Sequence, residues 1–389
     1  MRINLAILIC LLTLSTSGQN RDDFMLRQVQ AIETTRADED FSIPMLDSVV
    51  PNYRFIFTAE EHWLKVNTRV QGLFLPYLHQ QAGVRNLVVE GGYAYGWMIN
   101  RFLETGDSLY LMRALYDPPT CPRNQARFFQ DLYAYNQEQP ETNRIRVVGI
   151  DYEKSGHLAI ECLFHILPAK PLTAGVRDKV RELMEMYVME YEEREKELKR
   201  FFRQWYKEVQ ERKRAYRRYW GDEFPVFEMI LENTLQGFES PLLREFVYAY
   251  GDQKKREERM YDNFRLLFKM GKFNPGGFYA QFGGIHTELN PGINWGYKTL
   301  AQRLNEERYS PVYQQVLTIS KYFRRLGRIY EKFPEEELFR NVMDEIGFDR
   351  RQEIVICRLE GNEDLFPTIS QDFQFILIID EDMELERCE

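Results

Sequence analysis

Short apolar runs that end in polar or glycine-containing sequence recur along this chain of 389 residues, and longer stretches with helical periodicity lie between them. Runs of this kind are typical of buried strands. Their alternation with helices predicts an α/β fold with a mostly parallel central sheet flanked by helices. The strands are expected near residues 53–58, 86–92, 145–151, 277–282, 312–319, 353–359 and 373–379.

A long segment without a strand pattern separates the third run from the fourth. From about residue 174 to 235 it is rich in charged and aromatic residues. Glu195 and Lys199 have the i,i+4 spacing that supports an exposed helix face, whereas Phe201 and Trp205 provide a buried side. We therefore expect a long helical insertion, at about 174–235, in one α/β domain that covers residues 19–389; a separate helical domain is the alternative. A further long helix is expected over about 241–272.

The N-terminus has the pattern of a signal peptide. Arg2 precedes the apolar run from Leu5 to Leu14, and small residues follow as far as Gly18. An apolar run of about ten residues is too short for a permanent membrane span, which needs about 20. We expect cleavage near Gly18 and export of the mature protein to the periplasm or the medium, with no permanent membrane span.

Charge and cysteine content exclude some classes of function. The net charge is −9, which argues against nucleic acid as a partner because binding to phosphate backbones needs clustered cations. The cysteines at 121, 162, 357 and 388 lack the close paired spacing of a zinc site. Cys162 and Cys357 lie in apolar stretches and are expected to be buried thiols.

Polar side chains stand where the expected strands end. Glu60 and His62 follow the first strand, Glu90 the second, Asp151 the third and His286 the fourth. Ligands of open parallel sheets gather beyond these carboxyl ends. A histidine that titrates near neutrality can take a proton from water if a carboxylate orients its other ring nitrogen, and Glu60 and Glu90 are both candidates for that carboxylate. The pattern favours activation of water.

A competing interpretation is that these two histidines cap helices or bind backbone carbonyls. The remaining three, His79, His157 and His165, lie in helical patterns and are expected to be structural or surface residues. The pair at the strand ends is set apart by the acidic residues beside it. We therefore favour a functional role for His62 and His286.

One charged helix adds a cation and an amide to the candidate site. Arg256, Met260 and Asn263 share a face at helical spacing, whereas Arg259 points elsewhere. A buried Arg256 would pair with Glu90 or stabilise an oxyanion. The sequence has no Gly-x-Ser-x-Gly elbow, no Gly-x-x-x-x-Gly-Lys loop and no His-Glu-x-x-His motif, so water is the expected nucleophile.

Taken in order, these motifs resemble the erythromycin-esterase-like family, part of a wider group that includes haem-binding lipoproteins of the ChaN type and the TraB/Tiki proteins. The match runs through most of the mature chain. The residues that carry it are Glu60, His62, Glu90, Gly149, Asp151, Arg256, Glu257, Met260, Asn263 and His286.

The resemblance implies a metal-independent hydrolysis with His62 as the general base. It further implies that Glu90 orients this base or holds the water, that Arg256 stabilises charge, and that His286 is a second acid/base or a substrate ligand. Glu60 belongs to the same catalytic group. Asp151 and Asn263 are candidate substrate-binding residues. No cofactor and no metal ion are expected, and the expected partner is a small-molecule substrate.

Two departures from the family pattern matter for the substrate. Ala59 stands where the first motif usually has glycine, and the spacing of Glu60 and His62 is closer to the ChaN-like branch. The last motif offers only His286, where a second histidine usually follows soon after. Macrolide cleavage is therefore not assumed. The alternatives are binding of haem or a transition metal through the histidines and carboxylates, and a degenerate member of the family without turnover.

Overall fold

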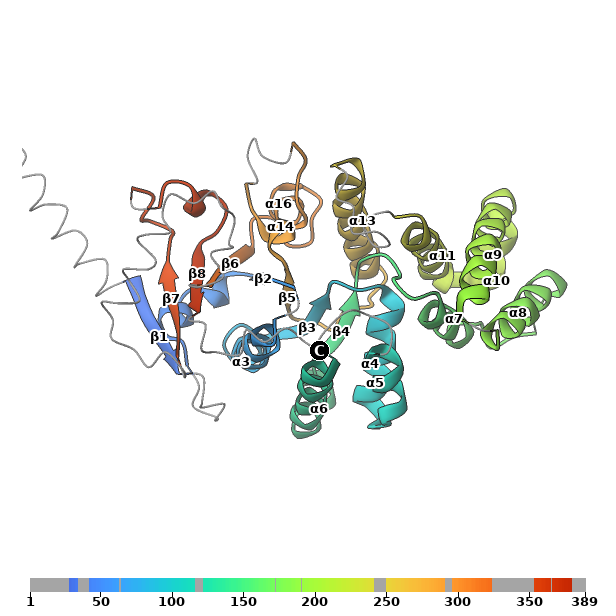
Figure 1. Cartoon of the computed structure of the whole chain (residues 1–389), viewed down its shortest axis with the longest axis horizontal. Helices are drawn as coiled ribbons and strands as arrows, with labels where there is room; N and C mark the ends of the chain where they lie inside the picture. Colours follow the sequence, from blue (N-terminus) through green and yellow to red (C-terminus); the bar gives the residue numbers. More distant parts are fainter. Residues whose placement is uncertain are drawn as a thin grey trace, which may run out of the picture.

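The computed structural model describes residues 28–33, 42–62, 64–115, 122–171, 173–189, 191–240, 250–290, 296–323, 353–364 and 366–379. One eight-stranded sheet runs through these residues in the order β1-β7-β8-β6-β2-β5-β3-β4 (Figure 1). Its strands are β1 (Val29–Glu33), β2 (Phe55–Glu60), β3 (Val84–Val89), β4 (Arg146–Gly149), β5 (Gly277–Gly283), β6 (Val316–Phe323), β7 (Glu353–Arg358) and β8 (Phe375–Ile379).

The sheet is mixed but mostly parallel. β2 pairs in parallel with β5 and β6, β3 with β4 and β5, and β6 with β8. Only β7 runs antiparallel to its neighbours β1 and β8. Every residue of β5 and β8 is buried, as expected of strands covered on both faces. The mixed α/β architecture and the seven predicted strands are confirmed, and β1 is an additional edge strand.

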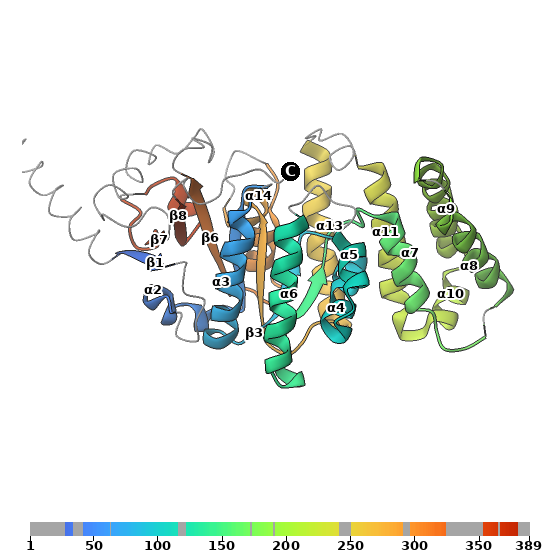
Figure 2. The same ribbon diagram turned by 60° about the horizontal axis from the view of Figure 1, so that its bottom comes forward.

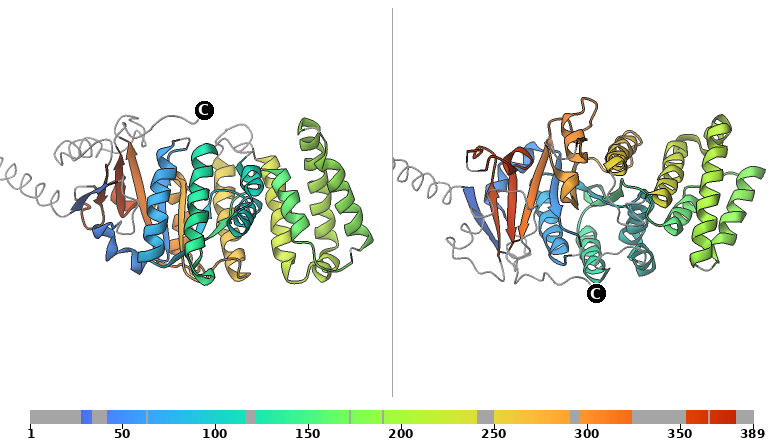
Figure 3. Two further views of the ribbon diagram at one scale, coloured as in Figure 1. Left: turned by 90° about the horizontal axis from the view of Figure 1, so that it is seen from below. Right: turned by 45° about the horizontal axis from the view of Figure 1, so that its top comes forward.

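Helices cover both faces of this sheet (Figures 2 and 3). One face carries α3 (Val66–Gln81), α4 (Tyr93–Thr105), α5 (Ser108–Leu115) and α6 (Pro122–Glu138). The other carries α13 (Tyr250–Lys269), α14 (Gly284–Thr287) and α16 (Leu300–Glu306). The short helix α2 (Pro44–Asp47) lies near β1 (Figure 2). The parallel strands thus lie between two layers of helices. Polar residues lie at the edge of the sheet where the carboxyl ends of these strands meet.

The described part of 156–165 and 174–239 holds helices and short turns but no strand, and extends the molecule beyond β4 (Figure 1). The helices are α7 (Gly156–His165), α8 (Ala174–Tyr187), α9 (Tyr191–Glu211), α10 (Lys213–Trp220) and α11 (Phe224–Glu239). Phe201 and Trp205 are buried on α9, as predicted, and Trp220 stacks on Phe227 with ring centroids 3.9 Å apart. That these helices form an insertion into a single domain stays a prediction.

The predictions for the signal peptide and for two of the cysteines concern residues that the structure does not describe. The expected signal peptide, residues 1–18, lies outside the described residues, as do Cys121 and Cys388. Cys162 and Cys357 are buried free thiols, as predicted. Among the described residues, no helix has the length and apolar character needed to cross a membrane.

Candidate functional site

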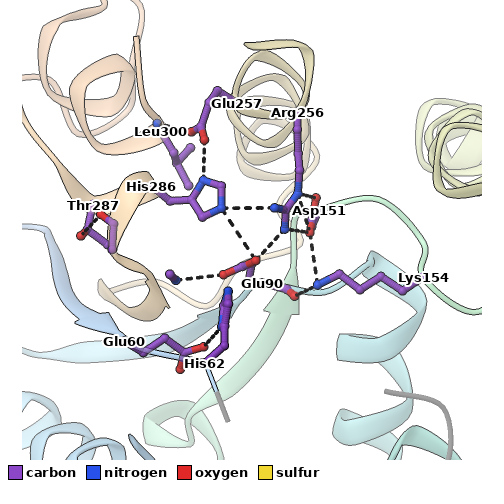
Figure 4. Close-up of polar contacts among 12 residues, drawn as sticks. Glu60, His62, Glu90, Asp151, Lys154, Arg256, Glu257, His286, Thr287 and Leu300 are labelled. Atoms are coloured by element: carbon purple, nitrogen blue, oxygen red, sulfur yellow. Dashed lines mark hydrogen bonds and ion pairs between the residues drawn. The ribbon is translucent and has the colours of Figure 1, made fainter. Parts of the chain in front are cut away.

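The carboxyl ends of four neighbouring strands bring the predicted site residues together (Figure 4). Glu60 is the last residue of β2, Glu90 directly follows β3, and Asp151 lies just beyond β4. His286 is in α14, the single turn that follows β5, and Arg256 reaches the same place from α13. Because parallel strands end at one edge of the sheet, residues up to 226 positions apart in the sequence meet there (60 to 286).

His62 and Glu60 form the most exposed pair of the site. The Nδ1–H of His62 donates to Oε1 of Glu60 over 2.8 Å, and the two side chains are 47% and 21% exposed. The other ring nitrogen, Nε2, has no hydrogen-bond partner in the part of the chain that the structure describes. A Cβ at Gly283 would lie 3.0 Å from this Nε2. Glycine at the end of β5 therefore leaves room for the ring.

The neighbouring carboxylates hold a proton on His62. Partial burial of the ring lowers its pKa, but the hydrogen bond that His62 donates to Glu60 and the charges of Glu90 and Glu60 act more strongly in the opposite direction. Together they raise the pKa of His62 from 6.5 to about 9. The resting ring is therefore an imidazolium at neutral pH, whereas the sequence suggested titration near neutrality.

Arg256 is the buried centre of the site. Its Nε and Nη2 donate to the two oxygens of Asp151 over 3.0 and 2.6 Å, and Nη2 also donates to Glu90 over 2.6 Å. All three side chains are at most 10% exposed. Burial opposes ionisation of Glu90 and Asp151, but the guanidinium holds the pKa of both below their usual range. The predicted pairing of Arg256 with Glu90 is present.

Glu90 is held from several sides. Its Oε2 accepts the backbone N–H of Gly283 over 3.0 Å, and the ammonium of Lys154 donates to its backbone oxygen over 2.9 Å. Lys154 also lies 3.6 Å from Asp151. Of the two carboxylates considered for orienting His62, Glu60 is the one in hydrogen-bond contact with the ring. Glu90 instead joins the buried guanidinium to the end of β5, just before the turn of helix that carries His286.

His286 forms a second histidine–carboxylate pair, which is buried. Its Nδ1 is bonded to Glu257, a side chain with no solvent exposure. The Nη1–H of Arg256 donates to Nε2 over 3.3 Å, so the tautomer assigned from these contacts carries its proton on Nδ1. Both ring nitrogens are engaged. In this arrangement His286 fixes Arg256, and of these two histidines His62 is the one with an open ring nitrogen.

The two predicted substrate-binding residues bind protein groups here. The amide of Asn263 donates to the backbone oxygen of Ile150 over 2.8 Å and is 2% exposed. Asp151 has no exposure and is occupied by Arg256. Asn263 thus supports the end of β4, from which Asp151 projects. Their role in binding substrate stays a prediction.

Four consecutive side chains of α13 contact four different parts of the fold. Arg256 binds the ends of β3 and β4, and Glu257 binds His286 of α14. Glu258 pairs with Arg303 of α16 over 3.1 Å, and Arg259 pairs with Glu232 of α11. Successive helical positions point about 100° apart, so four consecutive side chains reach elements on different sides of the helix.

The sequence patterns assign no site role to Glu257 and Lys154, and at Gly283 they predict only a tight turn of the backbone before His286. Glu257 was noted only as part of the motif around Arg256, although an acid next to a candidate arginine is itself a signal. Lys154 stands three positions after Asp151, within reach of the same strand end. Gly283 begins a double glycine, which indicates close approach of the backbone.

One set of side chains has the composition of a metal site. Glu60, His62 and Glu90 each offer a ligand atom, and these atoms lie within 4.8 Å of one another. Nitrogen and carboxylate ligands suit divalent transition metals. A bound cation would take the place of the proton that the carboxylates now hold on His62.

Comparison with known proteins identifies the fold. No family model matches this chain, and no curated protein matches it. Among solved structures, a protein from Bacillus cereus is 14% identical with a TM-score of 0.66, covering 96% of this chain and 99% of its own. A mutant of the erythromycin esterase EreC in its open conformation is 12% identical, with a TM-score of 0.64 and coverage of 93% and 98%. A succinoglycan biosynthesis protein, 12% identical, has a TM-score of 0.61 and coverage of 94% and 97%.

This chain therefore shares its fold over nearly its whole length with a group of proteins that includes an erythromycin esterase.

Proposed function

We propose that this protein is an exported hydrolase that cleaves an ester or a related carbonyl bond with water activated by His62. The observation that carries the proposal is the Glu60–His62 pair. Glu60 binds one ring nitrogen and leaves the other open on the exposed side of a buried carboxylate–guanidinium cluster. A histidine oriented in this way is a general base of the kind that acts on water. The shared fold with an esterase supports the same chemistry.

The reaction begins with the neutral form of His62. Its Nε2 takes a proton from a water molecule, and the resulting hydroxide attacks the carbonyl carbon. Glu60 stabilises the imidazolium that forms, because the carboxylate already raises the pKa of this ring. The imidazolium then returns the proton to the departing alcohol as the ester bond breaks. Water and ester are converted to acid and alcohol with no change in the protein.

The remaining charged groups shape the place where the carbonyl lies. Arg256 is neutralised by Glu90 and Asp151, so it acts chiefly by fixing Glu90 behind His62. Lys154 is 37% exposed and lies beside the same cluster. We assign to its ammonium the electrostatic stabilisation of the oxyanion, since it is the more accessible cation.

The direct test is hydrolysis of an ester panel by metal-free mature protein. The panel contains p-nitrophenyl acetate, p-nitrophenyl butyrate and an aliphatic lactone. His62→Gln should lower turnover by about 100-fold or more, within the range for loss of a general base. His165→Gln is the matched control because His165 is exposed on α7, and it should retain activity. Equal activity of wild type and His62→Gln on every hydrolysed ester would refute the assignment.

A metal-binding function is the second candidate, because Glu60, His62 and Glu90 have the donor set described above. Elemental analysis and an absorption spectrum of the purified protein test it. A stoichiometric transition metal or a haem Soret band, without ester turnover, would favour the binding function. A folded protein with neither ligand nor turnover would point to a degenerate member of the fold.

We also propose that residues 1–18 direct export. N-terminal sequencing of the protein recovered from the periplasm or the medium tests this directly. A mature N-terminus near Gln19 supports the proposal, whereas an intact Met1 on protein retained in the cytoplasm contradicts it.

A further inference from the structure

Lys321 is a buried lysine that none of the roles above employs. It lies in β6, next to β2 in the sheet, and is 3% exposed. Its ammonium has three donors. Among the described residues it makes one hydrogen bond, from Nζ to Oδ1 of Asn67 over 3.3 Å. A buried amine with so few partners is costly unless another charge supports it.

The strand register places Lys321 beside Glu60. β2 and β6 run in parallel, and their last paired residues are Thr58 and Ile319. Two residues further along each strand are Glu60 and Lys321, and side chains two positions apart return to the same face. Extended by two residues, this register sets Lys321 across from Glu60 on the neighbouring strand, where the charge of Glu60 acts on the ammonium without a direct ion pair between them among the described residues.

The electrostatics agree with this placement. Burial lowers the pKa of Lys321 and the charge of Glu60 raises it, and the balance leaves the pKa at about 7. Without Glu60, burial would favour the neutral amine still more strongly. The ammonium form of Lys321 thus depends on Glu60.

Asn67 connects this lysine to the turn that carries the histidine. Asn67 lies in the first turn of α3 and is 6% exposed. Its amide nitrogen donates to the backbone oxygen of Glu61 over 2.6 Å, while its amide oxygen accepts from Lys321. Glu61 stands between Glu60 and His62. Asn67 of α3 thus joins Lys321 of β6 to the backbone oxygen of Glu61, and this connection holds the turn in place.

We propose that Lys321 is a positioning residue for the Glu60–His62 pair, facing the Glu60 carboxylate and fixing, through Asn67, the turn that bears both side chains. The inference rests on the proposed function. Lys321 itself is too deeply buried to touch substrate. Its effect passes through the orientation of Glu60, which in turn orients the Nε2 of His62.

The test compares Lys321→Met with wild type and with Lys269→Met, a matched exchange at an exposed lysine of α13. Methionine keeps the length of the side chain and removes the charge. Replacing a poorly paired buried charge with an apolar side chain is often neutral or stabilising, so Tm should be unchanged or higher. Turnover of the best ester should nevertheless fall roughly 10- to 100-fold with KM within about two-fold, since small misplacement of a reacting group has effects of that size.

A readout independent of turnover is the NMR signal of the His62 Nδ1 proton, assigned by its absence in His62→Gln. At about pH 6 both His62 and Lys321 are charged. The signal should be protected in wild type and Lys269→Met, and broadened by solvent exchange in Lys321→Met. Asn67→Leu, which breaks the connection to Glu61, should broaden it in the same direction.

Unchanged turnover and an unchanged Nδ1 signal in Lys321→Met would overturn the inference. So would a fall in Tm that accounts for the loss of turnover while the Nδ1 signal persists, because that is the behaviour of a structural lysine. If wild type hydrolyses no ester, the proposed function fails, and the Nδ1 signal alone decides whether Lys321 positions the pair.

Discussion

Glu257 holds His286 through Nδ1, the ring nitrogen opposite the one that faces Arg256. One carboxylate oxygen accepts the Nδ1–H of His286, and the other accepts the backbone N–H of Leu300 over 2.6 Å. The carboxylate is wholly buried and serves two donors from separate elements. It thereby sets the tautomer of His286 that accepts from Arg256.

Glu257→Gln should impair both stability and turnover. The amide has one acceptor oxygen for two buried donors, so an N–H will face an N–H, at a cost of about 1–3 kcal/mol in the free energy of unfolding. Turnover should fall about 10-fold as His286 releases Arg256. Urea unfolding and ester kinetics measure the two effects. Glu258→Gln, next along the helix but at a half-exposed surface pair, should change stability by less than about 1 kcal/mol.

The pH dependence of ester hydrolysis should have an alkaline rise. His62 acts as a base only after losing its proton, so kcat/KM should increase with pH towards about 9. Glu60→Gln removes the charge that raises this pKa and leaves only a weaker, neutral acceptor for Nδ1–H, so it should move the rise to lower pH by roughly one unit or more. A rise at the same pH in both proteins would exclude His62 as the titrating base.

Gly283→Ala tests the contact between β5 and His62. The added Cβ would lie 3.0 Å from Nε2 and 3.2 Å from Cε1 of the ring, closer than ordinary van der Waals contact. The ring must shift, so turnover should fall about 10-fold or more with the fold retained. Gly277→Ala, in the same strand with neighbours at 3.4 Å or more, is the matched control. Full activity of Gly283→Ala would mean that the position of the ring is not critical.

Arg256→Met should be the most destabilising of these changes. It leaves the buried carboxylates of Glu90 and Asp151 without their partner, which costs about 3–5 kcal/mol in the free energy of unfolding. Arg256→Lys should not restore the loss, because an ammonium cannot reproduce the forked contact with Asp151. Arg265→Met, on the exposed side of the same helix, should cost less than about 1 kcal/mol. Chemical denaturation measures the free energy of unfolding of the three variants.

The apolar runs predicted most of the sheet because buried parallel strands are continuous in hydrophobicity. A charged residue within a strand interrupts such a run: the fifth predicted run ends at Ile319, yet β6 continues through Lys321 to Phe323. β1 was missed because its pattern is partly polar and its partner, β7, lies more than 300 residues away.

The candidate site could be predicted for residues that stand at the ends of strands. Glu60, His62, Glu90 and His286 meet because parallel strands share an edge. The partner of each group was not predictable, since Glu257 reaches His286 and Lys321 faces Glu60 only after the strands and helices have packed. The raised pKa of His62 likewise depends on charges brought together by folding.

Each of the four side chains from Arg256 to Arg259 is hydrogen-bonded to a different part of the fold, and this limits insertions and deletions in α13. A single residue inserted earlier in α13 would rotate all four by about 100° and disconnect β3, β4, α14, α16 and α11 together. Deletion of one residue would do the same in the opposite sense. Among related proteins we therefore expect α13 to keep its length. Insertions and deletions should occur mainly in the helices that extend beyond β4, where a change of length breaks fewer contacts at once.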